Sequence, residues 1–81
     1  MAGALKSEID LYIIAKVKHL RTLRKYSQAV LAVKLGVSDA FIGQIENPKH
    51  YSKYSMVQIN KLAKIFNCSP RDFLPEHPMP D

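Results

Sequence analysis

Hydrophobic residues recur at helical spacing over most of the chain, and short polar segments separate the runs. Between residues 8 and 25 the apolar positions recur at intervals of four, four and three residues: Ile9, Ile13, Val17 and Leu20. A second apolar stripe nearer the C-terminus consists of Met56, Ile59, Leu62, Ile65 and Phe66. Both patterns follow the period of one helix face. They predict amphipathic helices that contribute these faces to a shared core.

Five serines stand where helix N-caps are expected, because a serine hydroxyl can accept a hydrogen bond from a backbone N–H two or three residues on. They are Ser7, Ser27, Ser38, Ser55 and Ser69. Asp10 supports the first of them, Gln58 completes a capping box with Ser55, and Pro70 occupies the first position of the last helix. The caps predict five short helices, the first over about 8–25, and leave no obvious strand.

The stretch from Ser27 to Asn47 carries a helical pattern that a glycine interrupts. A single helix through Gly36 would cost about 1 kcal/mol at that residue relative to alanine. Two helices avoid this cost, because Gly36 can end the first in the left-handed conformation and Ser38 can start the second. The connection is short, so we expect the two helices to meet at a steep angle. Their inward residues form one small core: Leu31, Leu35, Val37, Ile42 and Ile45.

Composition adds the class of protein to this helical pattern. A length of 81 residues with 47% hydrophobic content fits one compact domain. The single cysteine, Cys68, excludes an internal disulfide and indicates a reducing, cytoplasmic setting. No apolar run reaches 18 residues, so we expect no membrane span.

The positive charge is concentrated on the middle of the chain. Residues 11–64 hold ten lysines and arginines against two acids, a net charge of +8, whereas residues 1–10 carry −1 and residues 65–81 carry −2. This balance favours a polyanionic partner such as nucleic acid. A solvated basic surface without a partner is the alternative.

No arrangement of residues typical of catalysis occurs in the sequence. The histidines His19, His50 and His77 are scattered, and Cys68 has no histidine or cysteine at metal-ligand spacing. No glycine-rich phosphate loop is present. We therefore expect a protein that is not an enzyme and that binds neither a metal nor a cofactor.

The residues around the glycine break match a known pattern. Counted from Gln28 as position one, apolar residues fall at positions 4, 8, 10, 15 and 18, with alanine at 5 and glycine at 9. This set resembles the helix-turn-helix pattern of DNA-binding proteins. An ordinary αα-hairpin within a helical bundle is the alternative.

The resemblance extends over most of the chain, from Ile13 to Leu74. The segments HLRTLRKYSQ, LAVKLGVS, IGQIEN and INKLAKIFNCSPRDFL are similar to those of the Cro/CI-type helix-turn-helix family, also called the XRE family. The family implies an all-α, five-helix lambda-repressor-like DNA-binding domain over residues 8–74, with the helix-turn-helix at helices 2 and 3. Residues 1–7 precede it as an N-terminal extension, and the proline-rich residues 75–81 are expected to form a flexible tail.

The same resemblance implies a recognition helix over residues 39–47 that enters the major groove. Its outward residues would read bases: Asp39, Ala40, Gly43 and Gln44. Gln44 can contact adenine, Asp39 can accept from cytosine, and Ala40 can lie against a thymine methyl group. Asp39 could instead be only a favourable residue at a helix start.

Residues around the two helices are implied to hold the DNA backbone. The candidate phosphate ligands are Ser27, Gln28, Ser38, Asn47, Lys49, Ser52 and Lys53. Ser27 could also be a helix cap alone, and each lysine a solvated charge. Arg21 and Glu46 match a pair that forms a partly buried salt bridge in such domains, and a surface arginine near phosphate is the other interpretation of Arg21.

These features together predict a small transcriptional regulator that binds double-stranded DNA sequence-specifically, in the role of a repressor. A homodimer on a two-fold operator is expected from the resemblance, with Phe73 and Leu74 either closing the core or forming a dimer patch. The alternative is an antitoxin, or another protein-interaction module, that uses the same fold to bind a partner protein such as a toxin.

Overall fold

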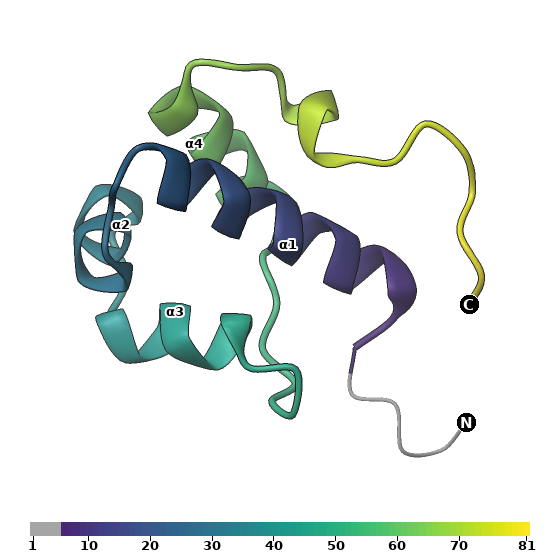
Figure 1. Ribbon diagram of the computed structural model, residues 1–81, viewed down its shortest axis with the longest axis horizontal. Coiled ribbons are helices and arrows are strands. Elements are labelled where there is room, and N and C mark those ends of the chain that lie inside the picture. Colours follow the sequence, from purple (N-terminus) through teal and green to yellow (C-terminus); the bar gives the residue numbers. More distant parts are fainter. Residues whose placement is uncertain (1–5) are drawn as a thin grey trace.

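The structure, a computed structural model, describes residues 6–81, which form helices and loops and contain no strand. The elements are α1 (Glu8–Leu23), α2 (Gln28–Leu35), α3 (Asp39–Glu46), α4 (Met56–Phe66) and the short 3-10 helix η1 (Pro70–Phe73). Figure 1 shows α1 crossing the middle of the molecule, with α3 on one side and α4 and η1 on the other. The all-α class predicted from the sequence is confirmed.

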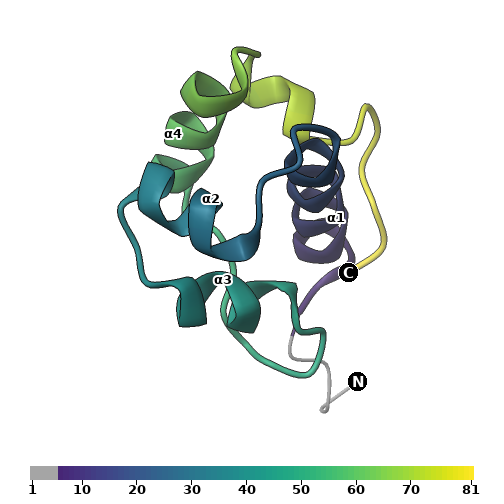
Figure 2. The ribbon, with the colours of Figure 1, turned by 60° about the vertical axis from the view of Figure 1, so that its left-hand side comes forward.

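All five predicted N-caps are present. The side chains of Ser7, Ser27, Ser38, Ser55 and Ser69 each accept a hydrogen bond from a backbone N–H two or three residues on. The break at Gly36 is also confirmed, because Gly36 has a φ of 82° and both its N–H and that of Val37 donate to the carbonyl of Ala32. The sequence between Ser27 and Asn47 therefore folds as two helices, which Figure 2 shows meeting at a steep angle.

Two helix boundaries differ from the prediction. The first helix ends at Leu23 instead of continuing to Lys25, because Lys25 adopts a left-handed conformation with a φ of 59°. The fifth helix is a single 3-10 turn of four residues and not an α-helix. Leu74 precedes Pro75, and a residue before proline is driven to extended backbone, which ends the turn.

The buried face of α1 is rotated relative to the predicted one. Ile14, Val17 and Arg21 are its buried residues, whereas the predicted Ile9 is exposed. The buried face includes Arg21 because its side chain forms an ion pair with Glu46 inside the molecule.

The predicted stripe of α4 is likewise wrong at one end. Met56 is 71% exposed at the first position of α4, where the helix start is open to solvent. Ile59, Leu62 and Phe66 are buried, as predicted. Phe73 is fully buried and closes this core, while Leu74 stays exposed.

The C-terminal residues 75–81 form no helix and pass beside the N-terminal half of α1 (Figures 1 and 2). Their predicted flexibility, like the division into residues 1–7, 8–74 and 75–81, stays a prediction. Residues 1–5 of the predicted N-terminal extension lie outside the described residues. Over residues 6–81, no helix combines the length and the apolar character that a membrane crossing would need.

Candidate nucleic-acid interface

An open groove lies between the N-terminal ends of α2 and α3. Its volume is about 540 Å³, and its lining consists of Ser27, Gln28, Ala29, Asp39, Ala40 and Gly43. Five of these residues were predicted as phosphate or base contacts from the sequence. Ala29 was missed, although its place as the second residue of α2 puts its N–H at a helix start, which is a signal that could have found it. The groove therefore brings together three of the four predicted base contacts and two of the seven predicted phosphate contacts.

The start of α2 has the properties of an anion site. The Ser27 hydroxyl accepts from the N–H of Val30 at 3.1 Å, and the first turn of α2 contains no acidic residue. The first N–H groups of a helix have no partner within the helix, so those of Gln28 and Ala29 are available to a ligand. The partial positive charge of the helix start favours a phosphate at this position.

The start of α3 is electrostatically different. Asp39 lies in its first turn, and its Oδ1 accepts from the N–H of Ala40 at 3.0 Å. The Ser38 hydroxyl accepts from the N–H of Phe41 at 3.2 Å. A carboxylate at this end offsets the helix dipole and repels phosphate. Of the two helix starts, that of α2 is therefore the better place for a phosphate.

The outer residues of α3 differ in their exposure to solvent. Asp39, Ala40 and Gln44 are exposed, whereas Gly43 is half-buried on the side that faces α2. A Cβ atom at Gly43 would lie 3.4 Å from Oε1 of Gln28. Phe41 is partly buried and packs against the core.

A buried ion pair joins α1 to the end of α3. Arg21 donates from Nε to Oε2 of Glu46 at 2.9 Å and from Nη2 to Oε1 at 3.0 Å, and both side chains are nearly buried. The salt bridge implied by the resemblance is thus present, in the bidentate geometry that makes such pairs strong. Arg21 also donates to the carbonyl of Tyr26 at 2.8 Å.

Gln28 extends this pair to α2. Its Nε2 donates to Oε1 of Glu46 at 2.9 Å, so one glutamate holds α1, α2 and α3 together. One donor of the Gln28 side-chain amide is therefore engaged, and the backbone N–H of Gln28 at the helix start is available to a phosphate. Sequence reasoning missed this bond because the partners are 18 residues apart.

The loop after α3 holds the remaining predicted phosphate contacts. Asn47 Oδ1 accepts from the N–H of Lys49 at 2.9 Å, and the N–H of Ser52 donates to Nδ1 of His50 at 3.1 Å. Lys53 lies 3.4 Å from Oδ2 of Asp10 and remains 58% exposed. Its charge is therefore partly balanced within the molecule.

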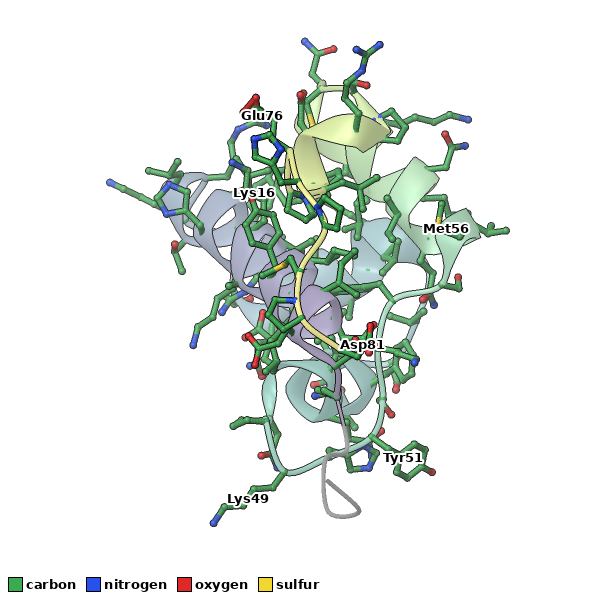
Figure 3. All side chains as sticks on the ribbon, turned by 90° about the vertical axis from the view of Figure 1, so that its right-hand side faces the viewer. Lys16, Lys49, Tyr51, Met56, Glu76 and Asp81 are labelled. Carbon is green, nitrogen blue, oxygen red and sulfur yellow. The ribbon has the colours of Figure 1, made fainter. Side chains whose placement is uncertain are left out.

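One further side chain of this loop was not predicted. Tyr51 is 71% exposed and stacks on His50 with ring centroids 4.5 Å apart. Figure 3 shows Lys49 and Tyr51 projecting from the loop at the end of the molecule that contains α3. An aromatic residue beside a lysine in an exposed loop is a signal that could have drawn attention to it.

Lys6 is a second residue that sequence reasoning missed. Its Nζ donates to the carbonyl oxygens of Gln44 at 3.3 Å, Ile45 at 2.6 Å and Asn47 at 2.6 Å, and the residue is 7% exposed. Burial lowers the pKa of the Lys6 amine below its ordinary value, and the nearby carboxylate of Asp10 acts in the opposite direction. No local pattern signals these bonds, because the partners are 38 or more residues away.

Within residues 6–81 no three histidine, cysteine, aspartate or glutamate side chains gather in a way that could hold a metal ion. The arrangement offers hydrogen-bonding groups and an exposed helix face instead. Such an arrangement can bind a polyanion and contact the edges of its bases.

The groove, the two helices that flank it and the short turn between them define a helix-turn-helix protein of the DNA-binding, transcription-regulating class. The chain belongs to the helix-turn-helix family HTH_3 (XRE-type), whose family model matches residues 17–73.

Solved structures similar to the chain include two regulators. The restriction-modification controller protein C.AhdI from Aeromonas hydrophila is 28% identical with a TM-score of 0.66, and the match covers 79% of this chain and 94% of that one. An HTH_3 family transcriptional regulator from Vibrio cholerae is 31% identical with a TM-score of 0.67, over 80% of this chain and 35% of that one.

A third similar structure shows the fold alone. The hydroxypropylphosphonic acid epoxidase from S. wedmorenis is 20% identical with a TM-score of 0.72, over 86% of this chain and 36% of that one. The chain thus spans nearly all of the controller protein but only about a third of the other two. No curated protein matches the chain.

Proposed function

We propose that this protein is a sequence-specific DNA-binding regulator that acts as a repressor. The observation that carries the proposal is the groove between α2 and α3, where a helix start without acidic residues lies beside the exposed face of a second helix. The similarity to a restriction-modification controller protein and to a transcriptional regulator supports the same function. The proposed activity is binding, without catalysis or cofactor.

In the proposed complex, a phosphate lies at the start of α2 and α3 enters the major groove. The N–H groups of Gln28 and Ala29 hold the phosphate, and Gln44 contacts a base edge, with adenine N6 and N7 as the best match for an amide. Asp39 disfavours other phosphates near α3 and can accept from cytosine. Ser52, Asn47 and Lys49 contact the backbone beyond the end of α3.

The test is selection of bound duplexes from a random pool, followed by affinity measurements at two salt concentrations. We expect the affinity to fall steeply with salt because counterions are released on binding. Gln44→Ala should cost about 1–3 kcal/mol at one base pair, whereas Lys49→Ala should weaken all sequences about equally. If no duplex is selected even at low salt, the proposal is wrong.

A second copy of the chain is the proposed partner on a two-fold operator. Exposed apolar side chains support a protein contact: Val33 is 81% exposed and, with Ala29, Val30 and Lys34, lines a shallow depression of about 310 Å³ on α2. The same patch is the observation that favours the alternative function, a module that binds a partner protein such as a toxin. Sedimentation of the purified chain distinguishes a homodimer from a complex with a different protein, because self-association needs no second protein.

A further inference from the structure

The recognition helix α3 ends differently from the other α-helices. Lys25, Gly36 and Asn67, which follow α1, α2 and α4, have left-handed backbone with φ of 59°, 82° and 55°. In each case the chain turns back so that a backbone N–H closes onto the last turn. Asn47, at the end of α3, is instead extended, with φ −85° and ψ 114°, and only its own N–H donates to the last turn, to the carbonyl of Gln44 at 3.2 Å.

Pro48 explains this difference. A residue before proline is driven to extended backbone, so Asn47 cannot close the helix in the left-handed conformation. Pro48 also has no N–H to donate to the carbonyl groups that a helix end leaves open. The last turn of α3 contains no basic residue that could compensate locally. α3 has only eight residues, a length at which a helix depends on its surroundings for stability.

Lys6 bonds the end of α3 from a distant part of the chain, in addition to the backbone N–H groups of Asn47 and His50 that donate to the carbonyls of Gln44 and Asn47. Its three hydrogen bonds, to the carbonyls of Gln44, Ile45 and Asn47, match the three donors of an ammonium group. A positive charge at a helix C-terminus is also favourable to the helix dipole. Because Lys6 is buried and all its donors are used, it cannot serve as a phosphate contact.

We propose that Lys6 is a positioning residue for DNA reading, which holds the end of α3 so that Gln44 meets its base pair in one orientation. The proposal rests on the proposed function. Gln44 is the link, because Lys6 bonds the backbone carbonyl of the same residue whose exposed side chain is proposed to contact a base edge. The segment before α1 thereby takes part in sequence recognition without contacting DNA.

The experiment compares Lys6→Met with Lys49→Met, since Lys49 is an exposed lysine near the same end of α3. The readouts are the ratio of affinities for the selected duplex and for one altered at the Gln44 base pair, and the slope of affinity against salt. Lys6→Met should lower the ratio about fivefold to tenfold, as when a helix loses its cap, and leave the slope unchanged. Lys49→Met should lower the slope by about one and leave the ratio unchanged.

Amide hydrogen exchange gives a readout that needs no DNA. In Lys6→Met the N–H groups of Asn47 and His50, which donate to carbonyls at the end of α3, should exchange faster, while those of α4 keep the wild-type rate. If exchange rises throughout the molecule, the comparison passes to Lys6→Arg. That variant keeps the charge but not the ammonium shape, and we expect a smaller loss of the affinity ratio.

The outcomes separate the two proposals. A wild-type chain that selects no duplex overturns the proposed function. A wild-type chain that binds, together with Lys6 variants whose affinity ratio equals that of wild type, overturns only the role of Lys6. A Lys6→Met variant with an altered salt slope and an unchanged ratio would identify Lys6 as a phosphate contact and also overturn the positioning role.

Discussion

At the scale of single residues, Tyr54 is the side chain whose environment is least favourable. Its hydroxyl is buried and, within residues 6–81, has no hydrogen-bonding protein group. Burial raises the pKa of Tyr54 well above its ordinary value, the charge of Glu46 raises it further and that of Arg21 opposes the rise. An unpaired buried hydroxyl is costly compared with a hydroxyl in water.

We expect Tyr54→Phe to raise the free energy of unfolding by about 1 kcal/mol, because the ring stays in place and the unpaired hydroxyl is removed. Urea unfolding followed by circular dichroism measures the change. Tyr51→Phe is the matched control, since that residue is largely exposed and should leave stability unchanged. A loss of stability in Tyr54→Phe would mean that the hydroxyl has a partner in solution.

The sequence predicts single residues well where the partners are fixed by a family pattern or lie close in the chain. Arg21 and Glu46 were paired through the resemblance, and the serine caps through local spacing. Lys6 and the bond between Gln28 and Glu46 were not predicted, because their partners come together only when distant helices pack. No local pattern around Lys6, Gln28 or Glu46 indicates these contacts.

At the scale of elements, Gly43 is expected to lower the stability of α3 and to keep the groove open. A glycine inside a helix is less favourable than alanine by about 1 kcal/mol. At Gly43 an added Cβ would make an ordinary contact with Gln28 Oε1, so the helix would tolerate it. The methyl group would, however, raise the floor of the groove in which DNA is proposed to bind.

Gly43→Ala should therefore raise the free energy of unfolding by up to about 1 kcal/mol and at the same time weaken DNA binding. Thermal unfolding and affinity for the selected duplex measure the two effects. Gly36→Ala is the contrasting variant: its φ of 82° makes alanine unfavourable by about 1–2 kcal/mol, although no atom beyond the neighbouring residues lies within 4 Å of the added Cβ. Unchanged affinity in Gly43→Ala would show that DNA does not reach the groove floor.

The helix starts of this chain were predictable, and so was the helix end at Gly36, whereas the end of α1 was not. A cap such as Ser55 with Gln58 acts within four residues, so the sequence contains the whole signal. The early end of α1 depends on the left-handed backbone of Lys25, which is rare for a residue with a side chain. The rotated face of α1 depends on Arg21 finding Glu46, a contact between helices.

At the scale of the whole molecule, α1 connects the other elements through bonds at both of its ends. Near its start, Asp10 accepts from Ser7 and lies 3.4 Å from Lys53 in the loop before α4. Near its end, Arg24 donates to the carbonyl of Phe66 at 2.9 Å and lies over the Phe66 ring. The fold is thus held together by polar contacts as well as by its core.

Acid should weaken the first of these connections. Burial alone would raise the pKa of Asp10, but its bonds to Ser7 and the charge of Lys53 lower it below the ordinary value of 3.8. A carboxyl group with a lowered pKa in the folded state stabilises the fold above pH 3.8, and the contribution disappears as the pH falls through the folded pKa.

The variant that tests this is Asp10→Asn. It should lower the free energy of unfolding by about 1 kcal/mol at pH 7, and the difference from wild type should shrink as the pH falls below the ordinary pKa of 3.8. Urea unfolding at several pH values measures it. Lys53→Met removes only an exposed ion pair and should cost a few tenths of a kcal/mol at most, on the order of a surface pair. A difference that stays the same at every acidic pH would contradict the titration of Asp10 as its cause.

The bond from Gln28 to Glu46 has a consequence for the DNA sequences that the protein can accept. It ties the helix whose start is proposed to hold a phosphate to the helix proposed to read bases, and Arg21 holds the same glutamate from α1. The offset along the duplex between that phosphate and the base pairs read by α3 is therefore constant. Operators recognised by chains that keep Arg21, Gln28 and Glu46 should share this offset even where their base sequences differ. Adaptation to a new operator would then proceed through the outer residues of α3, within an alignment that does not change.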